Sequence, residues 1–285
     1  MARGGNSFTF KNWERFCRQL QEKGISSIPA CCVMENRKGR PFLVLKHDIE
    51  IKPLKALAFA IIESRFNHRG SFYVQANLLK NHENIKILKK IQEMGHEVSY
   101  HHDVLDSNKG DMRKAVEEFR KNLVLFSQNG FYVKTVCQHG NPIIRRAGYS
   151  SNRDFFRNIE TSKKFKNITD IMVNFKLKIQ QDYKYFSDAG YHWNQISDPE
   201  NDDIIINKEN NNVLIQDLDS LEKAINLGDY SVIISTHPHR WNRFTILAES
   251  RLILFLIIKK ISIFFSRFSF LRRIMEKFYF LAKRV

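Results

Sequence analysis

The chain has 285 residues, of which 43% are hydrophobic and 27% are charged, so it is too apolar for a disordered protein and long enough for one large domain or two small ones. Its 46 Lys and Arg residues outnumber 30 Asp and Glu residues and give a formal charge of +16. This charge favours an anionic partner, such as a membrane face, a nucleic acid or a phosphorylated sugar. Because no zinc-finger, helix-turn-helix or aromatic RNA-binding signature accompanies the charge, we expect no nucleic-acid partner.

Helical and strand patterns alternate through the body of the chain, as a parallel α/β fold requires. Trp13, Phe16 and Leu20 recur at helical spacing and predict an opening helix that stops at Gly24. Further helices are predicted at 53–66, 85–95, 111–129 and 218–226. About seven strands are predicted, at 42–48, 71–74, 97–101, 132–137, 171–173, 183–186 and 231–236. That number can close or nearly close a barrel, and the polar stretch 198–212 is expected to be a surface loop.

The last 35 residues, 251–285, differ from the rest in composition. They hold nine Lys or Arg residues against Glu276 alone, and seven of the 23 Phe residues. We therefore divide the chain into a domain at 1–250 and a basic, Phe-rich amphipathic tail at 251–285 that forms a C-terminal helical extension. Two interpretations of the tail stay open: a helix at the surface of an anionic leaflet, or a terminal helix pair packed on the body with a solvated basic edge.

Cysteine usage and the apolar runs bear on location. Cys17, Cys31, Cys32 and Cys137 show no CxxC spacing, which favours a reducing compartment over disulfides or a thiolate zinc site. The N-terminus has no apolar signal region, and the longest apolar run, 252–258, is far shorter than the ~20 residues that span a bilayer. We expect a cytoplasmic protein, and a peripheral one on the inner face of the membrane if the tail binds lipid.

Polar side chains follow four of the predicted strands. Ligands of parallel α/β folds bind at the carboxyl ends of the strands, so these positions are the candidates for a site. Asp48 and Glu50 project to one side of the first strand, and His101 and Asp103 share a face of the third. His and carboxylate ligands suit zinc or another divalent metal, which makes a bound water nucleophilic near neutral pH. The polar groups are His47-Asp48-Ile49-Glu50, His101-His102-Asp103, Gln138-His139-Gly140-Asn141-Pro142 and His237-Pro238-His239-Arg240-Trp241.

Any one of these residues also has a structural interpretation. A single His at a strand end is more often hydrogen-bonded structure than a ligand, and we assign His47, His96 and His102 that role. Cys137 is expected to be a small core residue, and Arg145 and Arg146 are expected to be solvated. Four strand ends carrying His are harder to attribute to chance, so for the set we favour a metal site.

The order of these motifs resembles the polysaccharide deacetylases of the NodB-homology type. The likeness covers about residues 40–242 and is closest to a branch whose first motif reads His-Asp-Val-Asp, with a later Ser-Asp-x-Gly-x-x-Trp. The segments that carry it are Phe42-Leu-Val-Leu-Lys-His-Asp-Ile-Glu50, Gly70-Ser-Phe-Tyr-Val74, Gly95-His-Glu-Val-Ser-Tyr-His101, His139-Gly-Asn-Pro142, Ser187-Asp-Ala-Gly-Tyr-His-Trp193 and Ser235-Thr-His-Pro238. The resemblance implies a distorted (β/α) barrel of about seven strands that hydrolyses N- or O-acetyl groups on sugars with a divalent metal.

The resemblance also implies residue roles. Asp48 matches the general base, Glu50 and His101 match metal ligands, and His237 matches the residue that protonates the leaving group. The family's second metal His would lie four residues after His101, where this chain has Leu105. The third ligand then comes from His139, Asp103 or Asp188, or metal binding is weak or lost; we assign His139 as the ligand and Asp103, Asp188 and Trp193 to substrate binding. The family's third motif is replaced by Gln138-His-Gly-Asn-Pro142, which leaves the partner of the base open.

Three functional hypotheses follow. The first is a metal-dependent deacetylase, with Zn²⁺ as the expected metal, acting on an acetylated sugar or a lipid-linked glycan in polysaccharide or lipopolysaccharide assembly. The second is a catalytically inactive barrel that binds glycan or scaffolds a biosynthetic complex, as Leu105 and the altered third motif suggest. The third keeps the metal but acts on another amide or ester of a sugar nucleotide.

Overall fold

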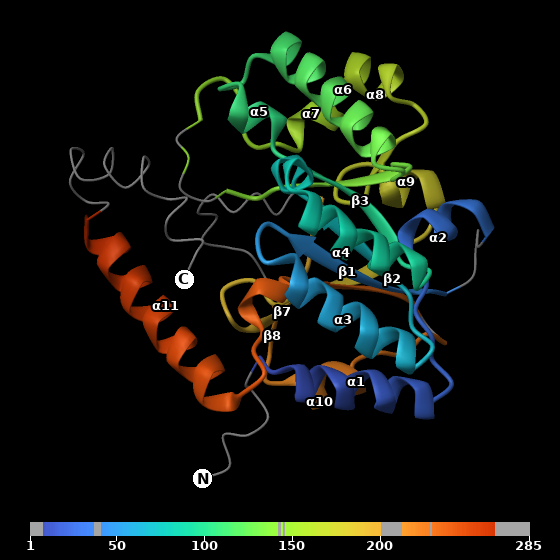
Figure 1. Cartoon of the computed structure of the whole chain (residues 1–285), viewed down its shortest axis with the longest axis vertical. Helices are drawn as coiled ribbons and strands as arrows, with labels where there is room; N and C mark the ends of the chain where they lie inside the picture. The colour runs from blue at the N-terminus through green and yellow to red at the C-terminus, as the bar shows by residue number, and fades with distance from the viewer. Residues whose placement is uncertain are drawn as a thin grey trace.

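The chain folds around one mostly parallel β-sheet, which places it in the α/β class (Figure 1). The computed structural model describes residues 8–36, 41–141, 144, 146–200, 213–228 and 230–265, except the side chains at 36, 259 and 261–265. The sheet has nine strands in the order β5-β4-β3-β2-β1-β9-β6-β7-β8. The strands are β1 (Leu43–Ile49), β2 (Gly70–Val74), β3 (Glu97–His102), β4 (Thr135–Gln138), β5 (Thr169–Asp170), β6 (Tyr183–Ser187), β7 (Trp193–Ile196), β8 (Val213–Ile215) and β9 (Ser231–Thr236).

Strands β1 to β6 and β9 run parallel, whereas β7 and β8 are antiparallel additions. Six of the parallel strands overlap predicted ones. The strand predicted at 171–173 is a turn, and β5 lies just before it. Strands β5 and β8 form the two edges of the sheet. Among the described residues no ladder joins these edges, so the sheet is not closed there. The α/β class is thus as predicted, and the barrel stays a prediction.

Helices cover the sheet on both faces. On one face α3 packs between α1 and α4, and α10 packs on α1 (Figure 1). On the other face α2 contacts α9. The helices are α1 (Phe10–Glu22), α2 (Ala30–Asn36), α3 (Pro53–Arg65), α4 (His82–Glu93), α5 (Val104–Ser107), α6 (Met112–Gln128), α7 (Asp154–Arg157), α8 (Ile159–Lys164), α9 (Phe175–Ile179), α10 (Leu218–Lys223) and α11 (Thr245–Phe265), with short 3₁₀ helices η1 (Ala76–Lys80) and η2 (Pro238–Arg240).

The central strand β1 is buried on both faces, and its alternation divides the core in two. Leu43 and Leu45 belong to the larger cluster with helices α1, α3, α4 and α6. Val44 belongs to a smaller cluster with Val33 of α2 and Phe175 of α9. Lys46 and Asp48 continue the smaller-cluster face toward the carboxyl end of the strand, so this face carries the polar site.

The predicted tail begins inside α11. This helix starts at Thr245 and runs through residue 250 without a break, while residues 266–285 of the tail lie outside the described residues. The division at 250 therefore stays a prediction, as does the loop at 198–212, most of which is also outside them. Within the described ranges we find no helix with the length and apolar character needed to traverse a bilayer.

Candidate metal centre

Glu50, His101 and His139 converge at the carboxyl edge of the sheet, directly after β1, at the end of β3 and after β4. One donor atom from each lies within 4.8 Å of the others. Glu50 Oε1 lies 3.4 Å from His139 Nε2, and the two imidazole rings are perpendicular with their centroids 5.3 Å apart. These are the three residues that the sequence predicts as metal ligands, and one carboxylate with two imidazoles suits a first-row divalent cation.

His101 is held in the tautomer that a cation requires. Its Nδ1 lies 3.1 Å from the Cys137 carbonyl oxygen, to which it donates, so Nε2 is left as the electron-pair donor. The β3–β4 register pairs His101 with Cys137 and so fixes this contact. Burial lowers the pKa of His101 to about 3, which keeps the imidazole neutral.

His139 is positioned by a buried amide that the sequence analysis did not identify. Asn152 Nδ2 donates to the carbonyl oxygen of His139 at 2.9 Å, and Asn152 Oδ1 accepts from the backbone N–H of Leu105 at 3.1 Å. The His139 N–H donates to the carbonyl oxygen of His102 at 2.7 Å. These bonds fix the segment after β4 against the start of α5, although nothing in the sequence around Asn152 marks it as part of a site.

Asp48, the candidate base, is paired with a buried lysine. Lys46 Nζ donates to Asp48 Oδ1 at 2.7 Å and Oδ2 at 2.6 Å, and to Ser235 Oγ at 3.1 Å. The β1–β9 register pairs Lys46 with Ser235. Burial raises the pKa of Asp48, but the charge and hydrogen bonds of Lys46 outweigh burial and hold it below its usual value. Asp48 is therefore ionised, and Lys46 is the partner of the base that the sequence left open.

His237, the candidate acid, is oriented by Asp188. His237 Nδ1 lies 2.6 Å from Asp188 Oδ1, and Asp188 Oδ2 accepts from the His237 N–H and from Trp241 Nε1, each at 3.0 Å. Burial opposes the charge of Asp188, but His237 and Arg240 hold its pKa well below the usual value. His237 Nε2 faces the site and lies 3.8 Å from Asp48 Oδ2. Asp188 thus positions His237. This role separates Asp188 from the three candidate metal ligands.

The other predicted residues have these surroundings. Asp103 follows β3 directly and lies at the start of α5, half-buried. Trp193 is buried at the start of β7, where it packs against Phe8 and Trp241. Leu105 is fully buried in the larger core cluster. Substrate binding by Asp103, Asp188 and Trp193 stays a prediction.

A second group of possible ligands shares His101 with the first. Asp48, His101 and Cys137 are all buried, and a donor atom of each lies within 4.8 Å of the others. Cys137 also belongs to the smaller core cluster, as the sequence predicts. The face of the sheet that carries the site therefore offers a thiol beside the carboxylate and imidazole donors.

The three His residues assigned to structure lie in buried hydrogen-bonded positions. His47 Nε2 lies 2.9 Å from Glu63 Oε1, and His102 Nε2 lies 2.9 Å from Asp170 Oδ2. His96 Nδ1 accepts from the Gly70 N–H at 2.9 Å.

The surroundings of Arg146 and His239 differ from what the sequence indicated. The prediction that Arg146 is solvated is wrong, because its guanidinium is buried and binds both oxygens of Asp106 at 2.8 and 2.9 Å. Its partner lies 40 residues away in the chain, which a local sequence pattern cannot reveal. His239, two residues after His237, was named among the polar residues at the last strand end but was given no role. Its Nδ1 is buried without a hydrogen-bond partner among the described residues, and its pKa falls to about 3 through burial.

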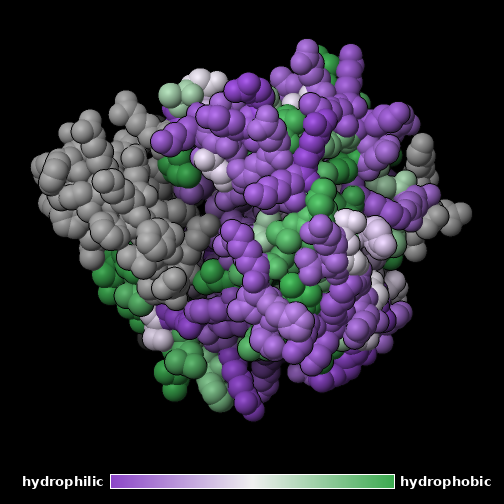
Figure 2. Space-filling model, turned by 45° about the horizontal axis from the view of Figure 1, so that its top comes forward, coloured by the Kyte–Doolittle hydropathy of each residue, from purple (hydrophilic) through white to green (hydrophobic). Residues whose placement is uncertain are grey.

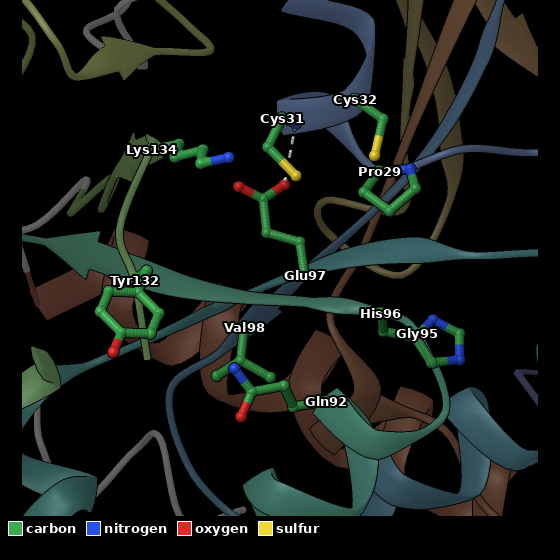
Figure 3. Close-up of a pocket in the computed structure, with 10 residues that line it drawn as sticks. All are labelled: Pro29, Cys31, Cys32, Gln92, Gly95, His96, Glu97, Val98, Tyr132 and Lys134. Carbon is green, nitrogen blue, oxygen red and sulfur yellow. Dashed lines mark hydrogen bonds between the residues drawn. The ribbon is translucent and has the colours of Figure 1, made fainter. Parts of the chain in front are cut away.

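A separate hollow of about 230 Å³ lies at the opposite, amino ends of β3 and β4 (Figure 3). The Cys31 side chain points toward the Glu97 carboxylate, and Tyr132 and Lys134 line the other side. Glu97 accepts from Ser71 Oγ at 2.7 Å and Thr135 Oγ1 at 2.6 Å, and burial raises its pKa. None of the predicted site residues lines this hollow, so we place the candidate site at the carboxyl edge.

Comparisons with known proteins found no match to a family model, to a curated protein or to a solved structure. The resemblance to NodB-type deacetylases therefore rests on the residues themselves, and the site must be interpreted from its geometry.

Proposed function

We propose that the chain is a metal-dependent hydrolase that removes an N- or O-acetyl group from a sugar of a cell-surface polysaccharide or lipopolysaccharide precursor. One observation carries the proposal: the donors of Glu50, His101 and His139 meet at the strand ends where Asp48 and His237 face each other. A donor set of this kind beside an acid and a base is what hydrolysis of an amide or ester needs. Zn²⁺ is the cation we propose, because it accepts two imidazoles and a carboxylate with a position left open.

Each residue then has a chemical role. A divalent cation held by Glu50, His101 and His139 would polarise the acyl carbonyl and lower the pKa of a water molecule. Asp48, kept ionised by Lys46, accepts a proton from the attacking water. His237 Nε2 donates a proton to the departing amine or hydroxyl, while Asp188 holds Nδ1 and so fixes the ring. Asp103 and Trp193 are proposed to contact the sugar.

The resemblance to NodB-type deacetylases suggests a more specific fold and substrate. A distorted barrel of the NodB kind would have the seven parallel strands found here, with β7 and β8 added at one edge. Acetylated sugars, free or on a lipid-linked glycan, are the substrates we propose, and a cytoplasmic location is proposed from the cysteine usage, which favours a reducing compartment.

One observation favours a second function, a catalytically inactive barrel that binds glycan or scaffolds a biosynthetic complex. Lys46 binds both carboxylate oxygens of Asp48, which makes the carboxylate a weaker base. The deacetylase remains the better supported function, because a binding protein does not require the ligand set of Glu50, His101 and His139.

Acetate release from N-acetylated oligosaccharides, measured with Zn²⁺, Co²⁺ or Mn²⁺ added, tests the proposal. We expect metal-dependent release that falls at least about 100-fold in Asp48→Asn and in His237→Ala. The matched control is His82→Ala, whose side chain is 77% exposed and pairs with Glu83, and which should keep wild-type activity. Absence of release with all three metals would contradict the enzyme and favour the binding protein.

A further inference from the structure

The helix α11 is apolar on the side that faces away from the body of the molecule. Figure 1 shows α11 at the margin, apart from the helices that cover the sheet, and Figure 2 shows hydrophobic side chains gathered at the corresponding edge. Ile246 is 81% exposed and Ile253 is 58% exposed. The exposed aliphatic face consists of Ile246, Leu247, Ile253, Leu254, Leu256 and Ile257.

The opposite side of α11 is anchored to the edge of the sheet that carries the candidate site. Ala248 is buried, and the Phe255 ring packs against Tyr191 at 5.0 Å between centroids. Arg251 donates to the carbonyl oxygen of His239 at 3.4 Å. The aliphatic face is therefore held in a fixed direction by contacts on the other side of the helix, and it needs an apolar partner.

Cations surround the base of this face. Lys52 lies at the start of α3, three residues before Lys55, whose Nζ donates to the carbonyl oxygen of His239 at 2.8 Å. Arg251 donates to the same oxygen, so Lys55 and Arg251 lie close together. Leu54, between the two lysines, is 66% exposed and extends the apolar surface. The sequence from 259 to 285 adds eight Lys or Arg residues against Glu276 alone.

We propose that α11 docks its exposed aliphatic face on an anionic lipid bilayer, with the exposed Lys52 near the headgroups. Aliphatic side chains flanked by Lys and Arg are the composition of helices that lie in the surface of an anionic leaflet. A second copy of the chain would bring the same cations against this face, whereas anionic lipid neutralises them. The surface is thus complementary to lipid in both apolarity and charge.

This docking would place the carboxyl edge of the sheet beside the bilayer, because His237 lies just before η2 and α11. If the proposed deacetylase activity holds, on which this step rests, the favoured substrate is an acetylated sugar carried on a membrane lipid. Docking itself does not depend on the activity.

Flotation of the full chain with vesicles tests the docking. The vesicles are phosphatidylcholine alone or phosphatidylcholine with phosphatidylglycerol. We expect the wild type to float with the anionic vesicles and to stay below with the neutral ones, and Ile253→Glu/Ile257→Glu to reduce flotation by about tenfold. The matched control Val124→Glu, at a 55% exposed position of α6, should float as the wild type does.

Three results would overturn the docking. These are no flotation of the wild type, equal flotation with both kinds of vesicle, or wild-type flotation of the double variant. A dimer in solution that the double variant converts to a monomer, without any flotation, would assign the face to a second copy instead. Acetate release from a soluble oligosaccharide, measured on the same variants, separates failure of docking from failure of the proposed activity.

Discussion

Lys46 is the residue that most changes the chemistry expected at the site. Its ammonium is buried beneath the base, with 2% of the side chain exposed, and its hydrogen bonds to described residues go to Asp48 and Ser235. Such a pair is expensive to desolvate, so removing one member leaves an uncompensated buried charge. We infer that Lys46 keeps Asp48 ionised and oriented, a positioning role.

Lys46→Met should therefore lower the free energy of unfolding by about 3–5 kcal/mol at pH 7. The double variant Lys46→Met/Asp48→Asn should cost clearly less than the sum of the single variants, because the stranded charge is gone. Urea unfolding measures all three.

The control for this cycle is an exposed ion pair. Lys86, 56% exposed, pairs with Glu83 on α4, and Lys86→Met should change the unfolding free energy by less than about 1 kcal/mol. Additive effects of the Lys46 and Asp48 substitutions would refute the buried pair as a coupled unit.

The three predicted ligands that the structure brings together share a simple signal. Glu50, His101 and His139 lie at or just after the ends of strands, where ligands of parallel α/β folds bind. Because side chains alternate along a strand, these residues could be grouped as one site without knowing which strands pair. Lys46 and Asn152 gave no such signal. The Lys46–Ser235 contact spans 189 residues and depends on the β1–β9 register. Register depends on tertiary packing, which one sequence does not reveal.

At the scale of elements, α5 gives a structural role to Leu105, which stands where the NodB-type pattern has a second metal-binding His. Leu105 lies on this four-residue helix and is fully buried in the larger core cluster. Its backbone N–H binds Asn152, which in turn holds the segment of His139. We infer that α5 supports the ligand from the loop after β4 and supplies no ligand from position 105.

Leu105→Ala should cost about 2–5 kcal/mol of unfolding free energy while leaving the metal content of the folded protein unchanged. The control Leu177→Ala, at a 78% exposed position, should change stability by less than about 0.5 kcal/mol. Thermal unfolding and elemental analysis of the same samples measure both quantities. Loss of metal from folded Leu105→Ala would contradict the assignment of the third ligand to His139.

Six of the seven parallel strands were predictable because each contains a short apolar run with polar residues at or after its end. The exception is β5, which consists of Thr169 and Asp170 alone. Strands β7 and β8 were not predicted. Val213 and Leu214 of β8 are exposed, and β7 is mostly half-buried, so neither shows the continuous apolar run of a buried strand. The pairing of β7 with β6 and of β8 with β7 at the edge of the sheet is a tertiary effect.

At the scale of the whole molecule, the sheet separates two ionisable networks. One is the candidate site on the face of Lys46 and Asp48. The other lies on the helical face, where Glu63 contacts His47 and His96 in the buried core. His96 accepts from the Gly70 N–H at Nδ1, so a proton on that nitrogen would break the bond.

This second network makes stability depend on pH. Burial lowers the pKa of His96 from 6.5 to about 4, so the unfolded chain binds its proton at higher pH than the folded chain. Despite burial, His47 and His96 lower the pKa of Glu63, whose stabilisation is also lost on acidification. The free energy of unfolding should fall by up to about 3 kcal/mol from the His96 group alone as pH drops from 6.5 to 4.

His96→Asn should flatten that pH dependence, because the amide oxygen can accept the Gly70 N–H without titrating. His82→Asn, at a 77% exposed position, should keep the wild-type slope. Urea unfolding across this pH range is the measurement. An unchanged slope in His96→Asn would show that another group carries the dependence.

The proposed function depends most on the metal centre. Elemental analysis tests for this centre most directly. After loading with Zn²⁺ and exhaustive dialysis, we predict about one ion per chain in the wild type and in His82→Ala, and a small fraction of that in Glu50→Gln, His101→Ala and His139→Ala. Metal-free wild type, or equal zinc in the wild type and folded His101→Ala, would contradict the metal centre and the function built on it.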